Sequence, residues 1–267
     1  MAAIDLESVS KVFRHNFGPF SWRASRRGET RALDAVTLSV AAARTLVLLG
    51  PNGSGKTTIL KLISGLLLPD GGRVLVEDKD TRLDPEGARR HVGFAVATER
   101  SFYPRLTAFE NLEFFAALDD VPRRGRRRRI EECLAKTGLS DVADVLVMEF
   151  SSGMYQRLGI ARALLKRPTV LLLDEPSRSL DPGSAIRLWQ LLREMAGEGT
   201  AVLMTTHNFE EAVRAGDSLC ILCRGRIIVR SALAAGTSVE DLRSLYFREV
   251  EPDFDAAQAV LGREVAL

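Results

Sequence analysis

The sequence predicts an α/β fold built on a mainly parallel β-sheet. Short apolar segments, each long enough for one buried strand, recur along the chain, and helical stretches lie between most of them. This alternation is typical of parallel sheets, because each connecting helix returns the chain to the edge where the next strand begins. Further alternating segments at residues 4–9 and 36–40 predict a small antiparallel sheet beside the core. The other expected strands are residues 45–49, 74–76, 92–96, 170–173, 201–204 and 219–222.

The middle of the chain departs from this pattern. Between about residues 107 and 165 no strand is expected, and apolar side chains such as Phe109 and Phe115 recur at helical spacing. Further helices are expected at residues 126–136 and 153–165. The sequence therefore predicts a helical insert within the α/β core.

The composition is that of an ordinary globular domain without a dominant charge. Of the 267 residues 46% are apolar, and the formal net charge is +2. These values allow a sizeable core and give no overall attraction to nucleic acid or to an anionic membrane. The apolar runs are far shorter than the roughly 20 residues of a membrane-spanning helix, and no signal peptide is expected. Work at a membrane would therefore require a membrane partner.

The three cysteines are Cys133, Cys220 and Cys223, and the last two form a C-x-x-C pair. A zinc site would need a second pair of ligands, which the sequence does not show. The pair lies in the apolar segment SLCILC, which is typical of a buried strand. We therefore expect a structural role and a reducing compartment such as the cytoplasm.

A glycine-rich loop follows the expected strand at residues 45–49 and precedes a helix expected at residues 57–63. It matches the pattern G-x-x-x-x-G-K-[S/T], in which backbone N–H groups and the helix N-terminus surround phosphates. Lys56 is expected to reach the β- and γ-phosphates, and Thr57 to offer its hydroxyl to Mg²⁺. The residues of this site are Gly50, Pro51, Asn52, Gly53, Ser54, Gly55, Lys56, Thr57 and Thr58.

Two other expected strands lead into polar residues. Asp174 and Glu175 follow residues 170–173, and His207 follows residues 201–204 after two threonines. Ligands of open parallel sheets bind at the carboxyl edge of the strands, so these side chains are expected beside the phosphate loop. There Asp174 suits a Mg²⁺ contact, Glu175 can polarise an attacking water, and His207 can contact the γ-phosphate.

Three segments keep two interpretations each. Ser151, Ser152 and Gly153 at an expected helix start fit either a second anion site or an ordinary N-cap. Residues 123–129, RRGRRRR, fit either a phosphate-rich partner or a solvated helix face with glutamates one turn on, and the nearly neutral chain favours the second. Residues 14–31 lie between two strands and fit either a functional loop or a plain surface loop.

Together these segments resemble the nucleotide-binding subunits of ABC transporters over residues 4–229. GPNGSGKTT is similar to their Walker A sequence, TVLLLDEP to Walker B, and FSSGMYQRLGIARALL to the signature and its helix. Ser179-Leu180-Asp181 resembles the D-loop, His207 the switch histidine, and Phe13 the aromatic residue that stacks on adenine. SSGM, ERSFY and RSLDP are similar to exporter cassettes that serve separate membrane subunits.

The resemblance implies an architecture and a function. The implied fold is a P-loop NTPase (RecA-like) core with a mainly parallel sheet, a small antiparallel β subdomain and an inserted α-helical subdomain. The nucleotide-binding domain would cover residues 1–235, with the helical subdomain at about 98–165 and a C-terminal helical extension at 236–267. The implied function is to bind and hydrolyse ATP with Mg²⁺ as the motor of an exporter of polysaccharide, lipid or drug-like cargo. The chain would be peripheral, held at the cytoplasmic face of the cell membrane by integral permease subunits.

The resemblance also implies a partner cassette, here expected to be an identical chain. Two cassettes would pair head to tail, so that each ATP lies between Lys56 of one chain and the signature residues Ser151 and Gly153 of the other, with Asp181 nearby. No nucleic-acid partner is implied. The alternative is a soluble ABC-type ATPase that acts on nucleic acid or ribosomes, but the long coiled coil that such proteins tend to carry between the Walker motifs is not seen here.

Two departures from the family pattern affect the expected site. The signature usually reads LSGGQ, whereas Phe150, Ser152 and Met154 replace three of its letters. The family also keeps a glutamine after the strand at residues 92–96, where this chain reads ATER. Glu99 is the nearest side chain long enough to substitute, so it is expected either to attract Mg²⁺ or to pair with a neighbouring arginine at the surface.

Overall fold

The core of the molecule is a six-stranded sheet in the order β10-β9-β3-β8-β7-β6. The computed structural model describes residues 2–15, 28–96, 101–234 and 236–250. Neighbouring strands of this sheet are parallel, except that β10 runs antiparallel to β9. The strands are β3 (Thr45–Leu49), β6 (Val92–Val96), β7 (Val170–Asp174), β8 (Ala201–Thr205), β9 (Ser218–Cys223) and β10 (Arg226–Ala232).

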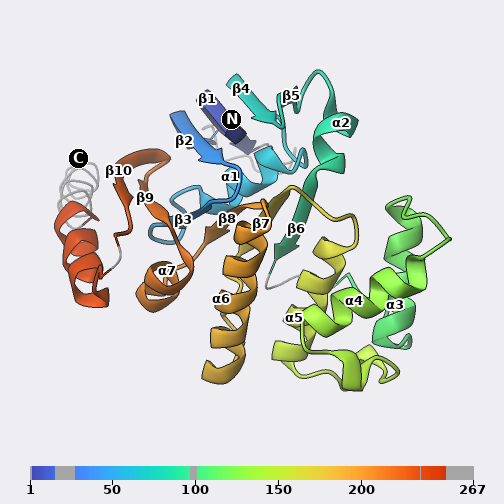
Figure 1. Ribbon diagram of the computed structural model, residues 1–267. Coiled ribbons are helices and arrows are strands. Elements are labelled where there is room, and N and C mark those ends of the chain that lie inside the picture. The colour runs from blue at the N-terminus through green and yellow to red at the C-terminus, as the bar shows by residue number, and fades with distance from the viewer. Residues whose placement is uncertain (1, 16–27, 97–100, 235, 251–267) are drawn as a thin grey trace, which may run out of the picture.

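A second sheet is antiparallel and has the order β2-β1-β4-β5. Figure 1 shows this sheet on the α1 side of the main sheet, opposite α6. The expected strand at residues 74–76 belongs here and not to the parallel core, because Val76 pairs with Ile4. The strands are β1 (Ala2–His15), β2 (Gly28–Ala41), β4 (Gly71–Val76) and β5 (Lys79–Asp80).

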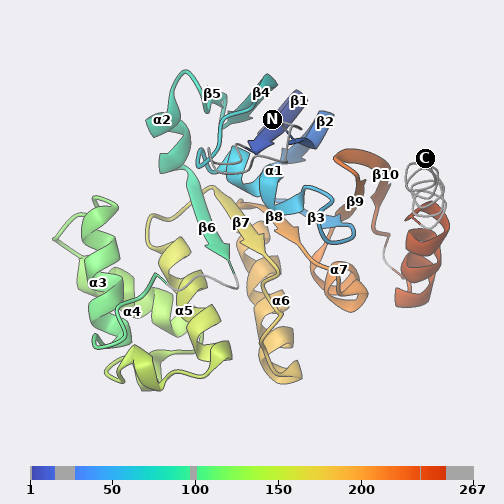
Figure 2. The same ribbon diagram turned by 180° about the vertical axis from the view of Figure 1, so that it is seen from behind.

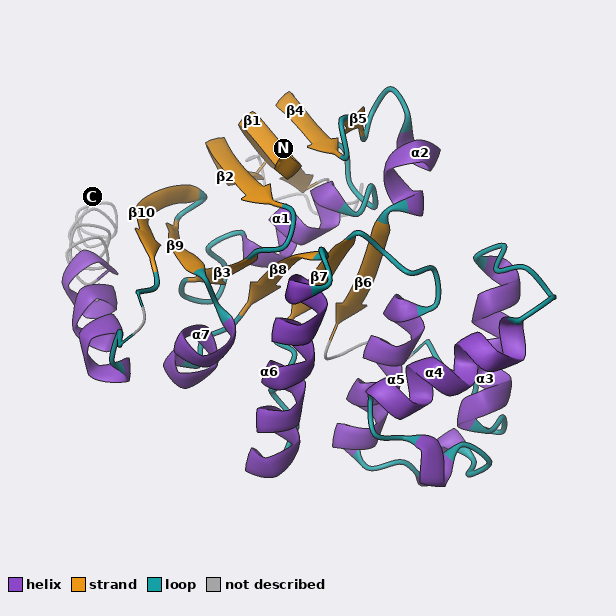
Figure 3. Ribbon diagram, in the orientation of Figure 1, coloured by secondary structure: helices purple, strands orange, loops and turns teal. Residues whose placement is uncertain are grey.

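Helices cover the main sheet and form the insert, which lies beyond β6 in Figures 1 and 3. The helices are α1 (Lys56–Ile63), α2 (Pro85–Arg90), α3 (Ala108–Leu118), α4 (Arg126–Lys136), α5 (Ser152–Leu164), α6 (Pro182–Gly197) and α7 (Phe209–Ala215), with short 3-10 turns η1 (Ser140–Val142) and η2 (Val147–Glu149). Residues 239–250 are also helical, and the C-terminal extension expected to residue 267 is described only that far.

The main sheet separates two hydrophobic cores. In β3, Val47 and Leu49 pack into the core shared with α6, α7 and the insert, whereas Leu46 and Leu48 pack toward α1 and the antiparallel sheet. Side chains of β7 and β8 alternate in the same way. Every residue of these three strands is buried, because helices or the second sheet cover both faces. This explains why the sequence shows continuous apolar runs there.

The insert is held together by a capped helix and an aromatic cluster. Thr107 caps α3 by accepting a hydrogen bond from the Glu110 N–H, and the Glu110 carboxylate accepts from the Thr107 N–H. The ring of Phe102 lies edge-on to those of Phe115 and Tyr155, at centroid distances of 5.6 and 5.1 Å. This cluster joins α3 to α5, and α5 packs against β6. The predicted α/β core, antiparallel sheet and helical insert are therefore confirmed.

The hairpin of β1 and β2 is longer than the sequence suggested. Arg14 is paired with Glu29 in the β1–β2 ladder, and their side chains form an ion pair at 3.1 Å. The prediction of a loop over the whole of residues 14–31 is therefore wrong at both ends. Charged cross-strand pairs extend a hairpin without adding to the apolar alternation that marks its centre. Residues 16–27 lie outside the described residues.

The C-x-x-C pair lies in β9, where Cys220 and Cys223 are both buried and unbridged. Burial raises the pKa of the Cys220 thiol to about 11, which keeps it protonated at neutral pH. The interpretation of this pair as part of a buried strand is confirmed. Among the helices of the described chain, none has both the length and the apolar character needed to span a membrane.

Candidate nucleotide-binding site

The loop between β3 and α1 requires glycine at two positions. A Cβ at Gly50 would lie 2.2 Å from the carbonyl oxygen of Leu222, and a Cβ at Gly55 would lie 2.6 Å from that of Ala32. Gly55 also has a φ of 109°, in the left-handed region. The backbone therefore follows a path that a larger residue would disturb, and it enters α1 at Lys56.

The start of α1 has no side-chain cap. Gly55 is the N-cap residue, and within the described residues no side chain accepts a hydrogen bond from the first turn. The N–H groups and the helix dipole at such an end favour a bound anion. Ser54 is buried, and its hydroxyl has no hydrogen-bond partner in the described part of the chain. These donors fit a phosphate group.

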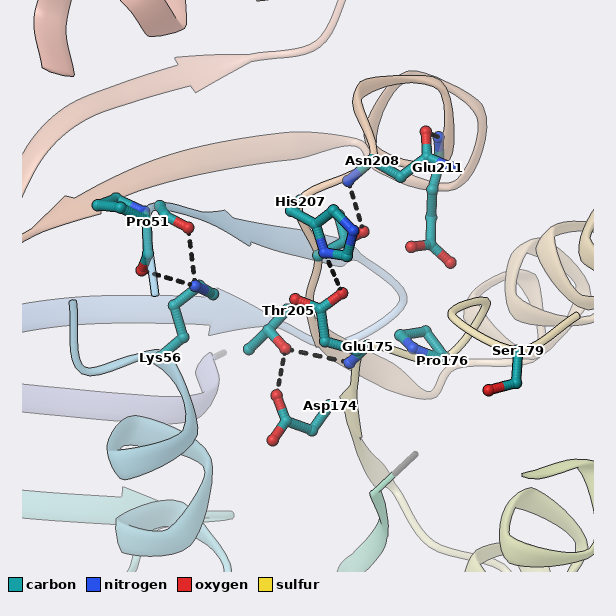
Figure 4. Close-up of polar contacts among 12 residues, drawn as sticks. Pro51, Lys56, Asp174, Glu175, Pro176, Ser179, Thr205, His207, Asn208 and Glu211 are labelled. Atoms are coloured by element: carbon teal, nitrogen blue, oxygen red, sulfur yellow. Dashed lines mark hydrogen bonds and ion pairs between the residues drawn. The ribbon is translucent and has the colours of Figure 1, made fainter. Parts of the chain in front are cut away.

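The side chain of Lys56 bends back over the loop. Its ammonium group donates hydrogen bonds to the carbonyl oxygens of Gly50 and Pro51, at 2.8 and 3.1 Å (Figure 4). Burial lowers the pKa of Lys56, and the neighbouring carboxylates of Glu175 and Asp174 oppose that shift. The lysine charge is therefore held close to the two carboxylates that follow the apolar run of β7.

Asp174 receives hydroxyl groups from two other elements. Thr57 of α1 donates a hydrogen bond to Asp174 Oδ2 at 2.8 Å, and Thr205 of β8 donates one to Oδ1. Hydroxyl and carboxylate oxygens are ligands that Mg²⁺ accepts, with phosphates and water completing its shell. Thr57 and Asp174 therefore fit the predicted metal contact. The sequence analysis missed Thr205, although a polar residue that ends an apolar strand was an available signal.

Glu175 is held in an unusual backbone conformation. Its φ is 54°, in the left-handed region, and its N–H lies 3.1 and 3.2 Å from the carbonyl oxygen and Oγ1 of Thr205. Its side chain is 17% exposed, and Oε2 lies 2.6 Å from Nδ1 of His207 (Figure 4). The strain is kept because neighbouring groups fix both the backbone and the carboxylate.

Lys56, Thr57, Asp174 and Glu175 line one surface cavity of about 470 Å³, a volume that suits a ligand of nucleotide size. The predicted residues that line it are Asn52, Gly53, Gly55, Lys56, Thr57, Thr58, Asp174 and Glu175. The lining residues that the sequence analysis missed are Thr30, Arg31, Ala32, Lys61, Val96 and Arg178. No local signal marked the residues of β2, because they reach the cavity only when the two sheets pack together.

The family model described as ABC transporter matches residues 33–178, which include both Walker sequences and the signature helix. This chain belongs to the ABC transporter family. The match covers more than half of the 267 residues. The resemblance drawn from the sequence motifs is confirmed.

Three curated relatives illustrate the similarity. The cassette is 37% identical over 215 residues to the daunorubicin resistance ATP-binding protein DrrA3 of Streptomyces coeruleorubidus, covering 80% of this chain and 66% of that protein. It is 37% identical over 205 residues to the Nod factor export ATP-binding protein I of Ralstonia nicotianae, covering 77% and 64%. It is 35% identical over 238 residues to the uncharacterized ABC transporter ATP-binding protein YdbJ of Bacillus subtilis, covering 89% and 75%. The chain thus spans about two thirds of the length of the first two relatives.

Solved structures agree with this assignment. The dimeric bacterial ABC transporter cassette MJ0796 has a TM-score of 0.74 and 30% sequence identity, covering 87% of this chain and 99% of that one. A structure described as the ATP binding subunit of an ABC transporter has a TM-score of 0.73 and 27% identity, covering 91% and 99%. The predicted P-loop NTPase fold class is therefore confirmed.

The signature residues of the cassette do not line the Walker A cavity. None of Ser151, Ser152 and Gly153 is among the described residues around it. Ser151 is the N-cap of α5, and its Oγ accepts a hydrogen bond from the Met154 N–H at 3.2 Å. Gly153 lies against the D-loop, since a Cβ there would be 3.1 Å from the carbonyl oxygen of Ser179. Within one chain this helix start is an N-cap, and its second phosphate contact stays a prediction.

A glutamine that the sequence analysis left unassigned ties the signature helix to the D-loop. Gln156 donates hydrogen bonds from Nε2 to the carbonyl oxygen of Glu175 at 3.0 Å and to that of Pro176. Its Oε1 accepts from the Ser179 N–H at 3.3 Å. Gln156 is only 5% exposed, so a polar residue on the buried face of α5 was the available signal.

The other predicted positions lie outside this cavity lining. Gly50, Pro51 and Ser54 belong to the loop but are not among the lining residues, and neither is His207, which reaches the site through its contact with Glu175. Asp181 caps α6 by accepting from the Ser184 N–H at 2.9 Å, and hydrogen bonds from Ser184 lower the pKa of Asp181. Phe13 is half-buried in β1 and pairs with Thr30, which does line the cavity. Glu99 lies outside the described residues. The adenine contact of Phe13 and the Mg²⁺ role of Glu99 stay predictions.

Proposed function

We propose that this chain binds MgATP and hydrolyses it as the motor subunit of an ABC exporter. The observation that carries the proposal is the position of Glu175, whose carboxylate shares the phosphate-loop cavity with Lys56. Thr205 holds its backbone in the left-handed conformation, and His207 fixes its side chain. A strained, doubly held carboxylate at a ligand cavity is typical of a catalytic group.

The residues of the cavity and His207, which contacts one of them, have separate roles in the proposed reaction. The N–H groups at the start of α1 hold the phosphates together with Lys56, whose ammonium group exchanges the loop carbonyls for phosphate oxygens. Thr57 and Asp174 would hold Mg²⁺, which neutralises part of the phosphate charge when bound. Glu175 orients the attacking water and accepts a hydrogen bond from it, while His207 keeps that carboxylate in place and reaches toward the γ-phosphate.

A second, identical cassette completes the site in this proposal. Ser151 and Gly153 lie outside the cavity of their own chain, and Ser151 is exposed. The related cassette MJ0796 is described as dimeric. Head-to-tail pairing would place the nucleotide of one chain against the start of α5 in the other, where helix N–H groups favour the γ-phosphate.

The membrane partner is proposed from the relatives and from an exposed patch on the insert. Relatives named for daunorubicin resistance and Nod factor export support transport of polysaccharide, lipid or drug-like cargo by permease subunits at the cytoplasmic face of the membrane. Tyr103, Phe114 and Leu118 are 47%, 37% and 63% exposed, and the first two rings lie 4.9 Å apart. Such a patch suits a protein interface. The alternative of a soluble ATPase is not favoured by these names.

Substitution of Glu175 tests the catalytic part of the proposal. Loss of a positioned general base typically lowers turnover by roughly 100- to 10,000-fold. We therefore expect Glu175→Gln to lose ATPase activity at least 100-fold, while its affinity for MgATP changes by less than about threefold, since the phosphate cradle is intact. Glu77→Gln is a matched control, because Glu77 also has a positive φ but lies in the turn between β4 and β5. Wild-type turnover in Glu175→Gln would remove this residue from the mechanism.

The exporter part is tested separately. The chain is purified with candidate permease subunits and reconstituted into vesicles, and ATPase rate and cargo movement are measured together. Coupled transport supports the proposal. An active ATPase that binds no permease and is not stimulated by any cargo would overturn the exporter assignment and leave the ATPase assignment intact.

A further inference from the structure

A cavity of about 730 Å³ lies away from the nucleotide site. Its walls come from the end of α2, the turn between α3 and α4, the first turns of α4, and the connection from α5 to β7. In Figures 1 and 2 that turn and that connection both lie on the side of the insert nearest α2. The cavity is therefore lined by both the core and the insert, and the proposed ATPase mechanism does not use it.

The charge of this cavity is strongly one-sided. Nine of its lining residues are ionisable, and six of these are cationic against three anionic ones, Asp119, Asp120 and Glu132. The cationic residues are Arg90, Arg124, Arg128, Arg129, Lys166 and Arg167. The excess of three positive charges exceeds the net charge of +2 for the whole chain, so positive charge is concentrated here.

A single carboxylate serves three arginines in this cavity. The oxygens of Glu132 lie 3.0, 3.4 and 3.5 Å from the guanidinium groups of Arg128, Arg129 and Arg167. The hydrogen bond from Arg128, assisted by Arg129, also holds the pKa of Glu132 below its ordinary value. One negative charge cannot neutralise three positive ones, so this cluster attracts a further anion.

The arginines of the RRGRRRR segment have different roles. Arg126 donates hydrogen bonds to the carbonyl oxygen of Val121, and Arg129 donates to those of Leu164 and Leu165. These two arginines therefore hold the backbone around the cavity in place. Arg127 lies 5.3 Å from the ring centroid of Phe109 and does not line the cavity.

Of the remaining arginines, Arg124 and Arg128 line the cavity. Arg124 makes no hydrogen bond or ion pair to any described residue, and the Arg128 side chain is 85% exposed. The interpretation of residues 123–129 as a solvated helix face with glutamate partners is confirmed for Arg127 and Arg128, which pair with glutamates one turn on. It does not account for the unpaired charge at Arg124 or for the shared carboxylate of Glu132.

We propose that this cavity is a binding site for a phosphate-bearing anion with two or more negative charges. Guanidinium groups present paired N–H donors that match phosphate oxygens, and an excess of three positive charges suits a multivalent anion. The cavity volume leaves room for the organic part of such a ligand. A soluble phosphorylated molecule and a phospholipid headgroup share this chemistry. A ligand there contacts Arg128 on the insert and Arg167 on the core side, and so bridges the two.

Inorganic tripolyphosphate is a suitable probe, and the full chain carrying Lys56→Ala is a suitable background, because that change suppresses binding of the probe at the Walker A loop. Isothermal titration calorimetry at low salt is expected to show one equivalent bound. Arg128→Glu in this background is expected to weaken binding at least tenfold. Arg127→Glu is the matched control. The Arg127 side chain is about as exposed as that of Arg128, and it also pairs with a glutamate four residues on. The control therefore makes the same charge change one residue away and leaves the same pair of glutamates at i and i+4. It is expected to change binding by less than twofold.

The source of the phosphate is tested with vesicles. Cosedimentation with phosphatidylglycerol vesicles, absent with phosphatidylcholine vesicles, lost in Arg128→Glu and competed by tripolyphosphate, would indicate a lipid headgroup. Binding of tripolyphosphate without any binding to vesicles would indicate a soluble ligand. Arg167→Glu, in the connection from α5 to β7, is expected to reproduce the loss if Arg128→Glu fails to fold. No binding of either probe, or equal losses in Arg127→Glu and Arg128→Glu, would overturn the proposal.

Discussion

The helices α1 and α5 both begin with small residues, but their first turns are satisfied in different ways. At α1, Gly55 is the N-cap in the left-handed conformation, and no side chain of the described part of the chain accepts a hydrogen bond from the first turn. At α5, Ser151 is the N-cap in an extended conformation, and its own hydroxyl accepts from the Met154 N–H. The first start is open to an anion from outside the chain, whereas the second is partly closed from within.

This difference distinguishes a phosphate-binding helix start from a capped helix start that contains similar small residues. At the open start, Lys56 and Thr57 of α1 and the carboxylates of Asp174 and Glu175, from the end of β7, line one cavity. The capped start has its serine exposed and borders the D-loop instead. A serine and a glycine at a helix start therefore do not define a ligand site. The surrounding charges and the missing side-chain acceptor define it.

The largest effect is expected from closing the open start of α1. Gly55→Ala places a Cβ 2.6 Å from the carbonyl oxygen of Ala32 at a φ of 109°. Strain of this kind is worth roughly 1–3 kcal/mol, and the loop must also shift away from the phosphate path. We expect the affinity for ATP, measured by calorimetry, to fall about 100-fold, where each tenfold step corresponds to about 1.4 kcal/mol.

Gly53→Ala is the control for this change. Gly53 lies in the same loop and also has a positive φ of 78°, but a Cβ there would meet nothing within 4 Å. Its affinity for ATP is expected to fall less than about tenfold, because only backbone strain is added. Wild-type affinity in both variants would show that this loop does not hold the phosphates.

The second prediction asks whether the capped start of α5 acts on a partner chain. Lys56→Ala and Ser151→Arg chains are each expected to lose ATPase activity. When they are mixed in equal amounts, half of the dimers carry both defects in one site and keep the other site intact. ATPase activity should therefore return to about a quarter of the wild-type rate per chain, provided that one intact site turns over alone. Mixtures as inactive as the separate variants would contradict the shared site.

A smaller effect distinguishes the role of Ser151 as a helix cap from its proposed contact with the nucleotide. Ser151→Ala removes the acceptor at α5, and Thr107→Ala removes the matching cap at α3 in the same insert. Loss of an N-cap costs about 1 kcal/mol, so both variants should melt at a temperature lower by roughly 2–4 °C. Only Ser151→Ala is expected to lower ATP turnover as well. Equal turnover in the two variants would reduce Ser151 to a structural cap.

The smallest expected effect is on stability and concerns α7. Asn208 caps the first turn of α7 with its side chain, as Ser151 caps that of α5. Burial raises the pKa of Glu211, which accepts a hydrogen bond from Trp189 Nε1 at 3.2 Å. The folded state therefore favours the neutral carboxyl group. Its contribution to stability is complete below the unfolded pKa, near 4.5, and is lost as the pH rises through the higher folded pKa.

Glu211→Gln cannot ionise and should therefore gain stability relative to the wild type as the pH rises from 4.5 to 8. Thermal melts at several pH values measure this difference, which is expected to be on the order of 1 kcal/mol. Glu210→Gln, one residue earlier and exposed, is the control. A stability difference that does not change with pH would show that Glu211 is ionised in the folded protein across this range.

Much of the fold could be predicted because its signals are local. The bounds of β3, β6 and α4 match the expected ranges. A short apolar run, or a charged helix that follows a glycine, is visible within a few residues of sequence. The carboxylates of Asp174 and Glu175 were placed correctly beside the loop for a related reason. They directly follow the apolar run of one buried parallel strand, and the ends of such strands share one sheet edge.

The sequence itself thus determined the strands, the phosphate loop and the carboxylates at the carboxyl edge of the main sheet. Each of these depends on residue type and on spacing within one element. Tertiary structure alone decided which distant side chains complete them. Thr205 reaches Asp174 across 31 residues, Gln156 reaches the carbonyl oxygen of Glu175 across 19, and Glu132 gathers arginines from two segments. Such contacts depend on strand register and helix packing, which bring side chains together in space without leaving a periodic pattern in the chain.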